Sequence, residues 1–326
     1  MPRSHRRLLP VLAVAALAAC DASSPGPGSS ASAPLRPRFA FVSNNFSPFW
    51  IIAQKGLEKA RQEFGIDVEF RAPRSGKLDE QRQILEDLLA KGIDGVAVSP
   101  IDPDGIADLL DRLADRCPLV CHDSDAPRSK RRCYIGTDNV KAGREAAKAM
   151  KEAIGEAGGK VALFVGRLDA QNAQERRQGF LDEILGSKIE LVRDYLDYTD
   201  RARAAQHARE ALQSQTNLVG LLGLWSYNGP ALAAALRDSD KLGRVAIVCF
   251  DEDEATLQGL QDGVIHATIV QKPLEFGYQS MRVLKAIRDG QADTVIPPGK
   301  IIDTGVEVVR RTSVIDFQKR LKDLLK

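Results

Sequence analysis

The sequence contains few of the features that mark an enzyme or a nucleic-acid-binding protein. It has no G-x-S-x-G nucleophile turn, no H-E-x-x-H zinc motif and no phosphate-binding P-loop. The formal net charge is only +2, so the chain offers no strongly basic surface for a polyanion. Its cysteines and histidines do not fall into zinc-binding spacings, and we expect no metal and no cofactor. These absences argue against catalysis and against a nucleic-acid partner.

Long apolar runs are also missing beyond the N-terminus, so no later segment is predicted to span a membrane. At the N-terminus, the basic stretch MPRSHRR precedes the apolar run LLPVLAVAALAA. This order is typical of a secretory signal, which we assign to residues 1–19. Leu-Ala-Ala-Cys at residues 17–20 resembles the lipobox of bacterial lipoproteins, which implies acyl chains on Cys20. A simple signal peptide with a chance cysteine is the alternative.

Residues 20–37 are rich in Ser, Pro, Gly and Ala. Such a composition cannot bury a core and predicts a flexible tether between the lipid and the folded part. Removal of residues 1–19, which hold three arginines and no acid, takes the net charge from +2 to −1. We therefore predict an exported, membrane-anchored lipoprotein that faces the periplasm; the sequence leaves open which membrane holds the anchor.

From residue 39 onward, short apolar strands alternate with amphipathic helices, which favours parallel sheets covered on both faces. We expect strands at 39–43, 68–70, 95–99, 118–123, 160–166, 189–195, 218–224, 245–251, 265–271 and 305–309. We expect helices at 48–64, 79–91, 103–116, 140–156, 172–185, 201–214, 229–237, 253–261, 274–289 and 315–325. The length is enough for about two domains of the doubly wound α/β class.

The two halves of the chain repeat one short pattern. LVCHD at 119–123 and IVCFD at 247–251 are both apolar strands that end in an aspartate. In open α/β sheets, ligands bind beyond the carboxyl ends of the strands. Asp123 and Asp251 therefore suggest a ligand held between two similar domains.

Several further motifs carry a family resemblance: GIDGVAVSP (92–100), YIGTDN (134–139), ERRQGF (175–180), VCFDEDE (248–254) and ATIVQKPLEFGYQSM (267–281). Their order and spacing resemble a periplasmic sugar-binding protein of the ribose/galactose type, a substrate receptor of ABC importers. The resemblance implies a type I periplasmic binding fold: two doubly wound parallel-sheet domains joined by a three-segment hinge. The implied lobes are 38–137 plus 272–303, and 138–271 plus 304–326.

Aromatic residues make up only 6% of the chain, yet NNFSPFW at 44–50 contains three. We expect Ser47 to cap a helix that has Pro48 at its first position. Phe49 and Trp50 then fall in the first helical turn, where the resemblance implies that two aromatic rings sandwich a sugar. Flat rings bury the C–H faces of a sugar with little loss of rotamer entropy. We expect Phe46 to be a packing residue.

The resemblance also implies polar ligand-binding residues, namely Asp123, Asp251, Arg176 and Gln271. For the two aspartates, capping of the next element or hinge hydrogen bonding is the alternative. The chain departs from the ribose pattern at Ser47, Ser124 and Tyr227, which we retain as ligand-binding positions. Trp225 is a further addition to the pocket, and Thr199 or Tyr198 takes the place of an aromatic before the 201–214 helix. These departures argue against ribose itself and leave a sugar or polyol of similar size, or an acidic sugar whose charge Arg176 meets.

The cysteines of the folded part leave two outcomes open. Cys117 and Cys133 would pair if their strands are neighbours and their Cα atoms reach disulfide distance; otherwise both are free thiols. Cys121 and Cys249 lie inside apolar strands and are expected to fill space. The acidic run at 251–255 could indicate a cation site, but we expect Glu252 to Glu254 to favour the following helix N-terminus through its dipole instead.

The sequence thus predicts a monomeric, non-catalytic binding protein that closes around a small sugar and presents it to an ABC permease. A sensor role is the alternative, with the closed form recognised by a chemoreceptor or a histidine kinase. An enzyme that uses Asp123 and Asp251 as an acid/base pair is the least favoured reading.

Overall fold

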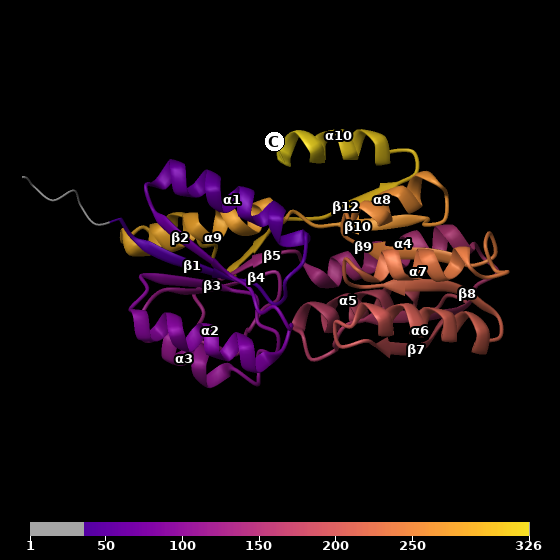
Figure 1. The fold of residues 1–326 in the computed structure, drawn as a ribbon, viewed down its shortest axis with the longest axis horizontal. Helices are drawn as coiled ribbons and strands as arrows, with labels where there is room; N and C mark the ends of the chain where they lie inside the picture. Colours follow the sequence, from indigo (N-terminus) through magenta and orange to yellow (C-terminus); the bar gives the residue numbers. More distant parts are fainter. Residues whose placement is uncertain (1–35, 326) are drawn as a thin grey trace, which may run out of the picture. The chain divides into compact units, whose positions relative to one another are not determined.

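The computed structural model describes residues 36–325 of the chain. The predicted signal peptide, Cys20 and nearly all of the predicted tether lie outside the described residues. Figure 1 shows that the described residues form two α/β lobes. Each lobe is built around its own six-stranded sheet.

The first sheet is entirely parallel, with the order β11-β5-β4-β3-β1-β2. Its strands are β1 (Arg38–Val42), β2 (Asp67–Arg71), β3 (Gly95–Val98), β4 (Leu119–His122), β5 (Tyr134–Gly136) and β11 (Ile301–Asp303). Its helices are α1 (Phe49–Phe64), α2 (Leu78–Lys91), α3 (Ala107–Ala114) and α9 (Pro273–Arg288), followed by the short 3₁₀ helix η1 (Ala292–Thr294). Helices α2 and α3 share one apolar core with the sheet, and α1 and α9 share the other. We call this sheet and its helices lobe 1.

The second sheet has the order β12-β10-β9-β8-β6-β7 and is parallel except for the β10–β12 pair. Its strands are β6 (Gly159–Val165), β7 (Ile189–Leu196), β8 (Leu218–Gly223), β9 (Ala246–Phe250), β10 (Ala267–Val270) and β12 (Glu307–Arg310). Its helices are α4 (Asn139–Ile154), α5 (Gln171–Ile184), α6 (Arg201–Ser214), α7 (Asn228–Arg237), α8 (Glu254–Gln261) and α10 (Val314–Leu325). Again two apolar cores cover the two faces. We call this group lobe 2.

The chain passes between the lobes three times, after β5, after β10 and after β11. Two of these crossings are tied together: Thr304 N donates to Gly136 O (2.8 Å) and Asp138 N donates to Asp303 Oδ1 (3.1 Å). The crossings leave from β11, the edge strand of the first sheet, and from β5 and β10, which are second from the same edge of their sheets. The opposite edge strands, β2 and β7, lie farthest from the crossings in strand order. The fold class predicted from the alternating pattern is confirmed.

Some predicted boundaries were wrong. The α3 helix begins at Ala107 instead of residue 103 because Asp102 Oδ1 accepts the backbone N–H groups of Asp104 and Gly105, which forms a turn first. Ser47 does not cap α1 with its side chain; its carbonyl accepts from Trp50 N (3.2 Å), and the helix begins at Phe49. Phe46 is not a packing residue, since 73% of it is exposed.

Of the two outcomes left open for Cys117 and Cys133, the structure shows the second, because both residues are free thiols. The β4–β5 register pairs Cys121 with Tyr134, so Cys133 lies beside Val120 and about three residues along the strand from Cys117. At about 3.3 Å per residue, that offset exceeds the roughly 4.4–6.8 Å that a disulfide allows between Cα atoms. The two thiols also face different cores, one on each side of the sheet.

Candidate ligand-binding site

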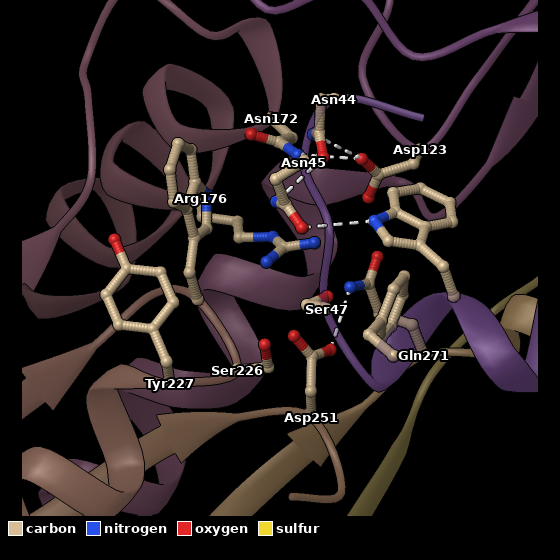
Figure 2. A pocket seen from close by; sticks show the side chains of 13 residues that line it. Asn44, Asn45, Ser47, Asp123, Asn172, Arg176, Ser226, Tyr227, Asp251 and Gln271 are labelled. Atoms are coloured by element: carbon tan, nitrogen blue, oxygen red, sulfur yellow. Dashed lines mark hydrogen bonds between the residues drawn. The ribbon is translucent and has the colours of Figure 1, made fainter. Parts of the chain in front are cut away.

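A pocket lies where loops leave the carboxyl ends of strands in both sheets (Figure 2); its roughly 340 Å³ of space not filled by atoms includes open solvent. That position is the one at which open α/β sheets bind ligands. Lobe 1 contributes Asn44, Asn45, Ser47, Phe49, Trp50 and Asp123. Lobe 2 contributes Asn172, Arg176, Trp225, Ser226, Tyr227 and Asp251, and Gln271 follows β10 at a crossing. The structure therefore brings eight of the nine predicted ligand-binding residues together.

Asp123 anchors the lobe 1 side of the pocket. The residue is buried and has a left-handed backbone, with φ of 57°. Its Oδ2 accepts hydrogen bonds from Asn44 Nδ2 (3.0 Å), Ser99 Oγ (2.8 Å) and, from lobe 2, Asn172 Nδ2 (3.4 Å). Burial raises the pKa of Asp123, although Arg176 and these donors oppose the shift. Because all three donors reach Oδ2, the other carboxylate oxygen is left for a ligand hydroxyl.

Asp251 occupies the matching place in lobe 2. It is also buried and left-handed, with φ of 69°. Gln271 Nε2 donates to its Oδ1 (2.8 Å), which ties the end of β9 to the crossing after β10. Burial raises the pKa of Asp251, and the nearby Asp123 carboxylate adds to the shift, while Arg176 opposes it. Neither aspartate caps a helix: the cap of α8 is Asp253, which accepts from Ala255 N.

Arg176 is a buried cation whose positive charge opposes the rise that burial causes in the pKa of both Asp123 and Asp251. It is 1% exposed and projects from α5 into the pocket (Figure 2). Its Nε donates to Asn139 Oδ1 (2.9 Å), its Nη1 donates to Leu224 O (2.7 Å), and its guanidinium lies 4.4 Å from the Phe250 ring centre. These contacts hold the guanidinium group in one orientation, in which Nη2 has no hydrogen-bond partner in the protein.

Aromatic rings line the pocket from both lobes. In lobe 1, Phe49 and Trp50 pack edge-to-face at 5.0 Å, and Trp50 Nε1 donates to Asn45 Oδ1 (3.2 Å). In lobe 2, Trp225 and Tyr227 lie 6.4 Å apart, also edge-to-face. Gly166 makes room for this pair, since a Cβ at that position would lie 2.0 Å from the Trp225 ring.

Four buried polar atoms of the pocket residues have no hydrogen-bond partner: Arg176 Nη2, Trp225 Nε1, Asn172 Oδ1 and Gln271 Oε1. Buried polar groups are normally paired, because an unpaired one costs about 1–3 kcal/mol. Two of these atoms are donors and two are acceptors. A ligand that can both donate and accept would satisfy all four.

Ser124 is the predicted ligand residue that the structure places outside the pocket lining. The left-handed turn at Asp123 redirects the chain, and Ser124 N donates to His122 O (2.6 Å). Tyr227 lines the pocket through its ring, but its hydroxyl donates to Asp197 (2.5 Å). Neither Tyr198 nor Thr199 lines the pocket, and Tyr198 is exposed.

Sequence analysis missed Asn44, Asn45, Asn172 and Ser226. Asn172 could have been found, because it precedes Arg176 by four residues and so lies on the same face of α5. Glu252, in the acidic run before α8, is buried, and neither of its carboxylate oxygens has a hydrogen-bond partner. Its expected effect on the helix N-terminus stays a prediction. Arg177, the next residue of α5, is half-buried, and its Nε donates to both carboxylate oxygens of Asp194.

Residues 36–325 contain no cluster of three or more side chains suited to hold a metal ion. Within the same range, no helix combines the length and the apolar character that a bilayer crossing requires.

The fold and the pocket together define a two-lobed binding protein. A family model described as "Periplasmic binding protein domain" matches residues 39–292, so the chain belongs to that family of non-catalytic binding proteins. It is similar to the D-allose-binding periplasmic protein of Escherichia coli (strain K12), with 27% identity over 257 residues, 76% of this chain and 83% of that protein.

Two solved structures extend the likeness. An ABC transporter solute-binding protein from Burkholderia graminis C4D1M, in complex with D-arabinose, is 30% identical, with a TM-score of 0.79 over 85% of this chain and 96% of that one. A chain of the XylFII–LytSN complex is 28% identical, with a TM-score of 0.78 over 86% of this chain and 99% of that one. The family resemblance found in the sequence is confirmed.

Proposed function

We propose that this chain is the extracytoplasmic receptor of an ABC importer that captures a monosaccharide or a related small polyol. The observation that carries the proposal is the set of four unpaired polar atoms between aromatic walls. Every sugar hydroxyl both donates and accepts, so a polyol can meet donors and acceptors together. The C–H faces of a sugar ring can pack against the aromatic rings of Phe49, Trp50 and Trp225. The sugar-binding relatives described above support this ligand class.

The charges in the pocket favour an uncharged sugar over an acidic one. Asp123 and Asp251 provide two carboxylates against the single guanidinium of Arg176. Two of the three nitrogens of that guanidinium already hold protein oxygens. A sugar acid would therefore bring its negative charge toward two buried carboxylates, where electrostatic interactions are only weakly screened.

Binding is proposed to proceed by closure of the two lobes about the three crossings. Asp123 and Asn172 already bond across the pocket, and a ligand would add contacts to both lobes at once. Because those contacts form only in the closed arrangement, the ligand stabilises that arrangement. The energy for transport would come from the partner ATPase, and the permease would bind the closed form of this protein.

A thermal-shift panel tests the ligand class. At least one neutral member of a panel that includes D-allose, D-arabinose, D-ribose and sugar alcohols should raise the melting temperature, because a ligand at 100 times its Kd adds about 2.7 kcal/mol to stability. D-Ribose is expected to be a weak member, given the departures from the ribose pattern. The matching uronic and aldonic acids should give little or no shift. The absence of a shift with every neutral sugar and polyol would overturn the proposal, whereas a shift with the acids alone would overturn its charge argument.

A sensor role is the second candidate, and the structural likeness to a chain of the XylFII–LytSN complex favours it. Deletion of the gene separates the two roles. Loss of sugar uptake supports transport, whereas normal uptake with loss of a sugar-induced response supports sensing.

We also propose that Cys20 carries the membrane anchor and that residues 20–37 form the tether. Mass spectrometry of the mature protein should find an acylated N-terminal cysteine at position 20. An unmodified N-terminus would support a simple signal peptide instead.

A further inference from the structure

Asp197 is a buried carboxylate next to the pocket that does not line it. It follows β7 directly and is 1% exposed. Its Oδ1 accepts from the Tyr227 hydroxyl (2.5 Å) and from Thr199 N (2.9 Å), and its Oδ2 accepts from Asn228 Nδ2 (3.1 Å). Asp197 therefore joins the Tyr227 wall of the pocket to the turn at residues 197–200, which we call the lobe 2 turn.

The lobe 2 turn has an unusual backbone. Tyr198 and Thr199 are both left-handed, with φ of 55° and 67°. Residues with a Cβ rarely adopt this conformation, and two in a row need outside support. The bonds from Thr199 N to Asp197 and from Tyr198 N to Gly166 O (2.9 Å) provide it.

The lobe 2 turn meets lobe 1 at Gly76. A methyl group placed on Gly76 would lie 3.0 Å from the Thr199 hydroxyl oxygen. Gly76 is in the loop between β2 and α2, and Glu80 holds that loop by accepting from Arg74 N and Ser75 N. Each side of the contact is thus organised by one carboxylate.

This contact lies at the far side of the cleft from the hinge. The loop of Gly76 follows β2 and the lobe 2 turn follows β7, and these are the edge strands opposite the crossings. Points farthest from a hinge move most when two lobes separate. The Thr199–Gly76 contact therefore has to break for the cleft to open.

We propose that Asp197 is a positioning residue for ligand retention: the same carboxylate fixes the Tyr227 wall and presents Thr199 to Gly76 of the other lobe. The inference rests on the proposed function, because it concerns the same pocket. Asp197 would govern the rate at which a bound sugar leaves without touching the sugar.

Asp197→Asn tests the proposal with little change of shape. All three partners of Asp197 are hydrogen-bond donors, and the asparagine amide brings an NH₂ group, which is also a donor. That NH₂ group would face either Asn228 Nδ2 or the Tyr227 hydroxyl and Thr199 N, so at least one hydrogen bond would be lost. In the ligand-free protein, the amides of Tyr198 and Thr199 should then exchange hydrogen faster. In the sugar-bound protein, we expect the dissociation rate to rise about tenfold and the association rate to stay within about twofold.

Both tryptophans of the chain, Trp50 and Trp225, line the pocket, so stopped-flow fluorescence with D-allose, D-ribose or D-arabinose can measure both rates.

Gly76→Ala and Thr199→Ala test the contact itself. Gly76→Ala adds a methyl group at a residue with φ of 63° and should weaken binding. If the contact matters, Thr199→Ala in the same chain restores part of the loss, because it removes the hydroxyl that the methyl group meets. Backbone strain alone would give no such recovery.

The outcomes separate the two proposals. If Asp197→Asn lowers stability but leaves both the dissociation rate and the exchange of residues 198–199 unchanged, the residue is merely structural and the inference is wrong. Should that variant fail to fold, Thr199→Ala alone must still accelerate dissociation, and an unchanged rate overturns the inference. If the wild type binds no neutral sugar or polyol of the thermal-shift panel, the proposed function loses its support, while the exchange measurement still decides whether Asp197 positions the turn.

Discussion

Asp123 and Asp251 end equivalent strands of the two sheets in the same left-handed conformation. The backbone carbonyl of each aspartate accepts a hydrogen bond from a hydroxyl group of the neighbouring strand. Tyr134 Oη donates to Asp123 O (2.8 Å), and Thr268 Oγ1 donates to Asp251 O (2.7 Å). The donors also correspond, since Tyr134 pairs with Cys121 and Thr268 with Cys249 in the two ladders. The two lobes thus present one carboxylate each to the pocket by the same local device.

Asp251→Ala should lower sugar affinity by at least about tenfold, because removing a buried charged acceptor costs more than about 1.4 kcal/mol. Titration calorimetry measures the effect. Asp253→Ala, two residues along, is the matched control: it removes the α8 cap, should cost about 1 kcal/mol of stability and should leave affinity unchanged. Equal affinity of the Asp251→Ala protein and the wild type would remove Asp251 from the site.

Arg176→Lys should weaken both binding and folding, although the charge is kept. A lysine cannot reach Asn139 Oδ1 and Leu224 O together, and each buried acceptor left unpaired costs about 1–3 kcal/mol. Arg177→Lys provides the control, since its bonds to Asp194 lie near the surface and contribute less than about 1 kcal/mol. Comparable losses from the two substitutions would contradict the distinct role assigned to Arg176.

The stability of the ligand-free protein should respond to the charge on Asp251. Its pKa is raised in the folded state by burial, so the folded state holds the proton more tightly than the unfolded state. The cost of ionising it is absent below about pH 4, the ordinary Asp value, and grows as the pH rises toward the raised pKa. Asp251→Asn should therefore gain stability relative to the wild type between about pH 4 and pH 7.

Chemical denaturation at several pH values measures that difference, with the exposed Asp240→Asn as the control. Since Arg176, Asp123 and Glu252 also act on Asp251, the difference between variant and wild type is the informative quantity. A difference that stays constant with pH would show that burial does not shift the titration of Asp251.

Reducing agents should leave the melting temperature unchanged, because the four described cysteines are thiols. A disulfide that closes a loop of roughly 15 residues would contribute about 3 kcal/mol. Its reduction would then lower the melting temperature by several degrees. A drop of that size on addition of dithiothreitol would contradict the register found between β4 and β5.

Much of the fold could be predicted from local pattern, because the alternation of apolar strands and amphipathic helices depends on nearby residues. The 201–214 helix has its predicted bounds, and most others differ by one or two residues. The larger error at α3 arose where a side chain, Asp102, competed with the helix for backbone N–H groups. The predicted strands did not include β5 and β11, which have only three residues each and so give too short a pattern to recognise.

The sequence by itself determined the fold class and the two aspartates at the ends of equivalent strands, since these follow from residue order and periodicity, and its motifs carried the family resemblance. Only the tertiary structure decided which side chains share the pocket. Asn172 reaches Asp123 of the other lobe, Ser124 turns away, and Tyr227 gives its hydroxyl to Asp197. These outcomes depend on strand register, on left-handed backbone at single residues and on contacts between segments far apart in the chain, which no local pattern encodes.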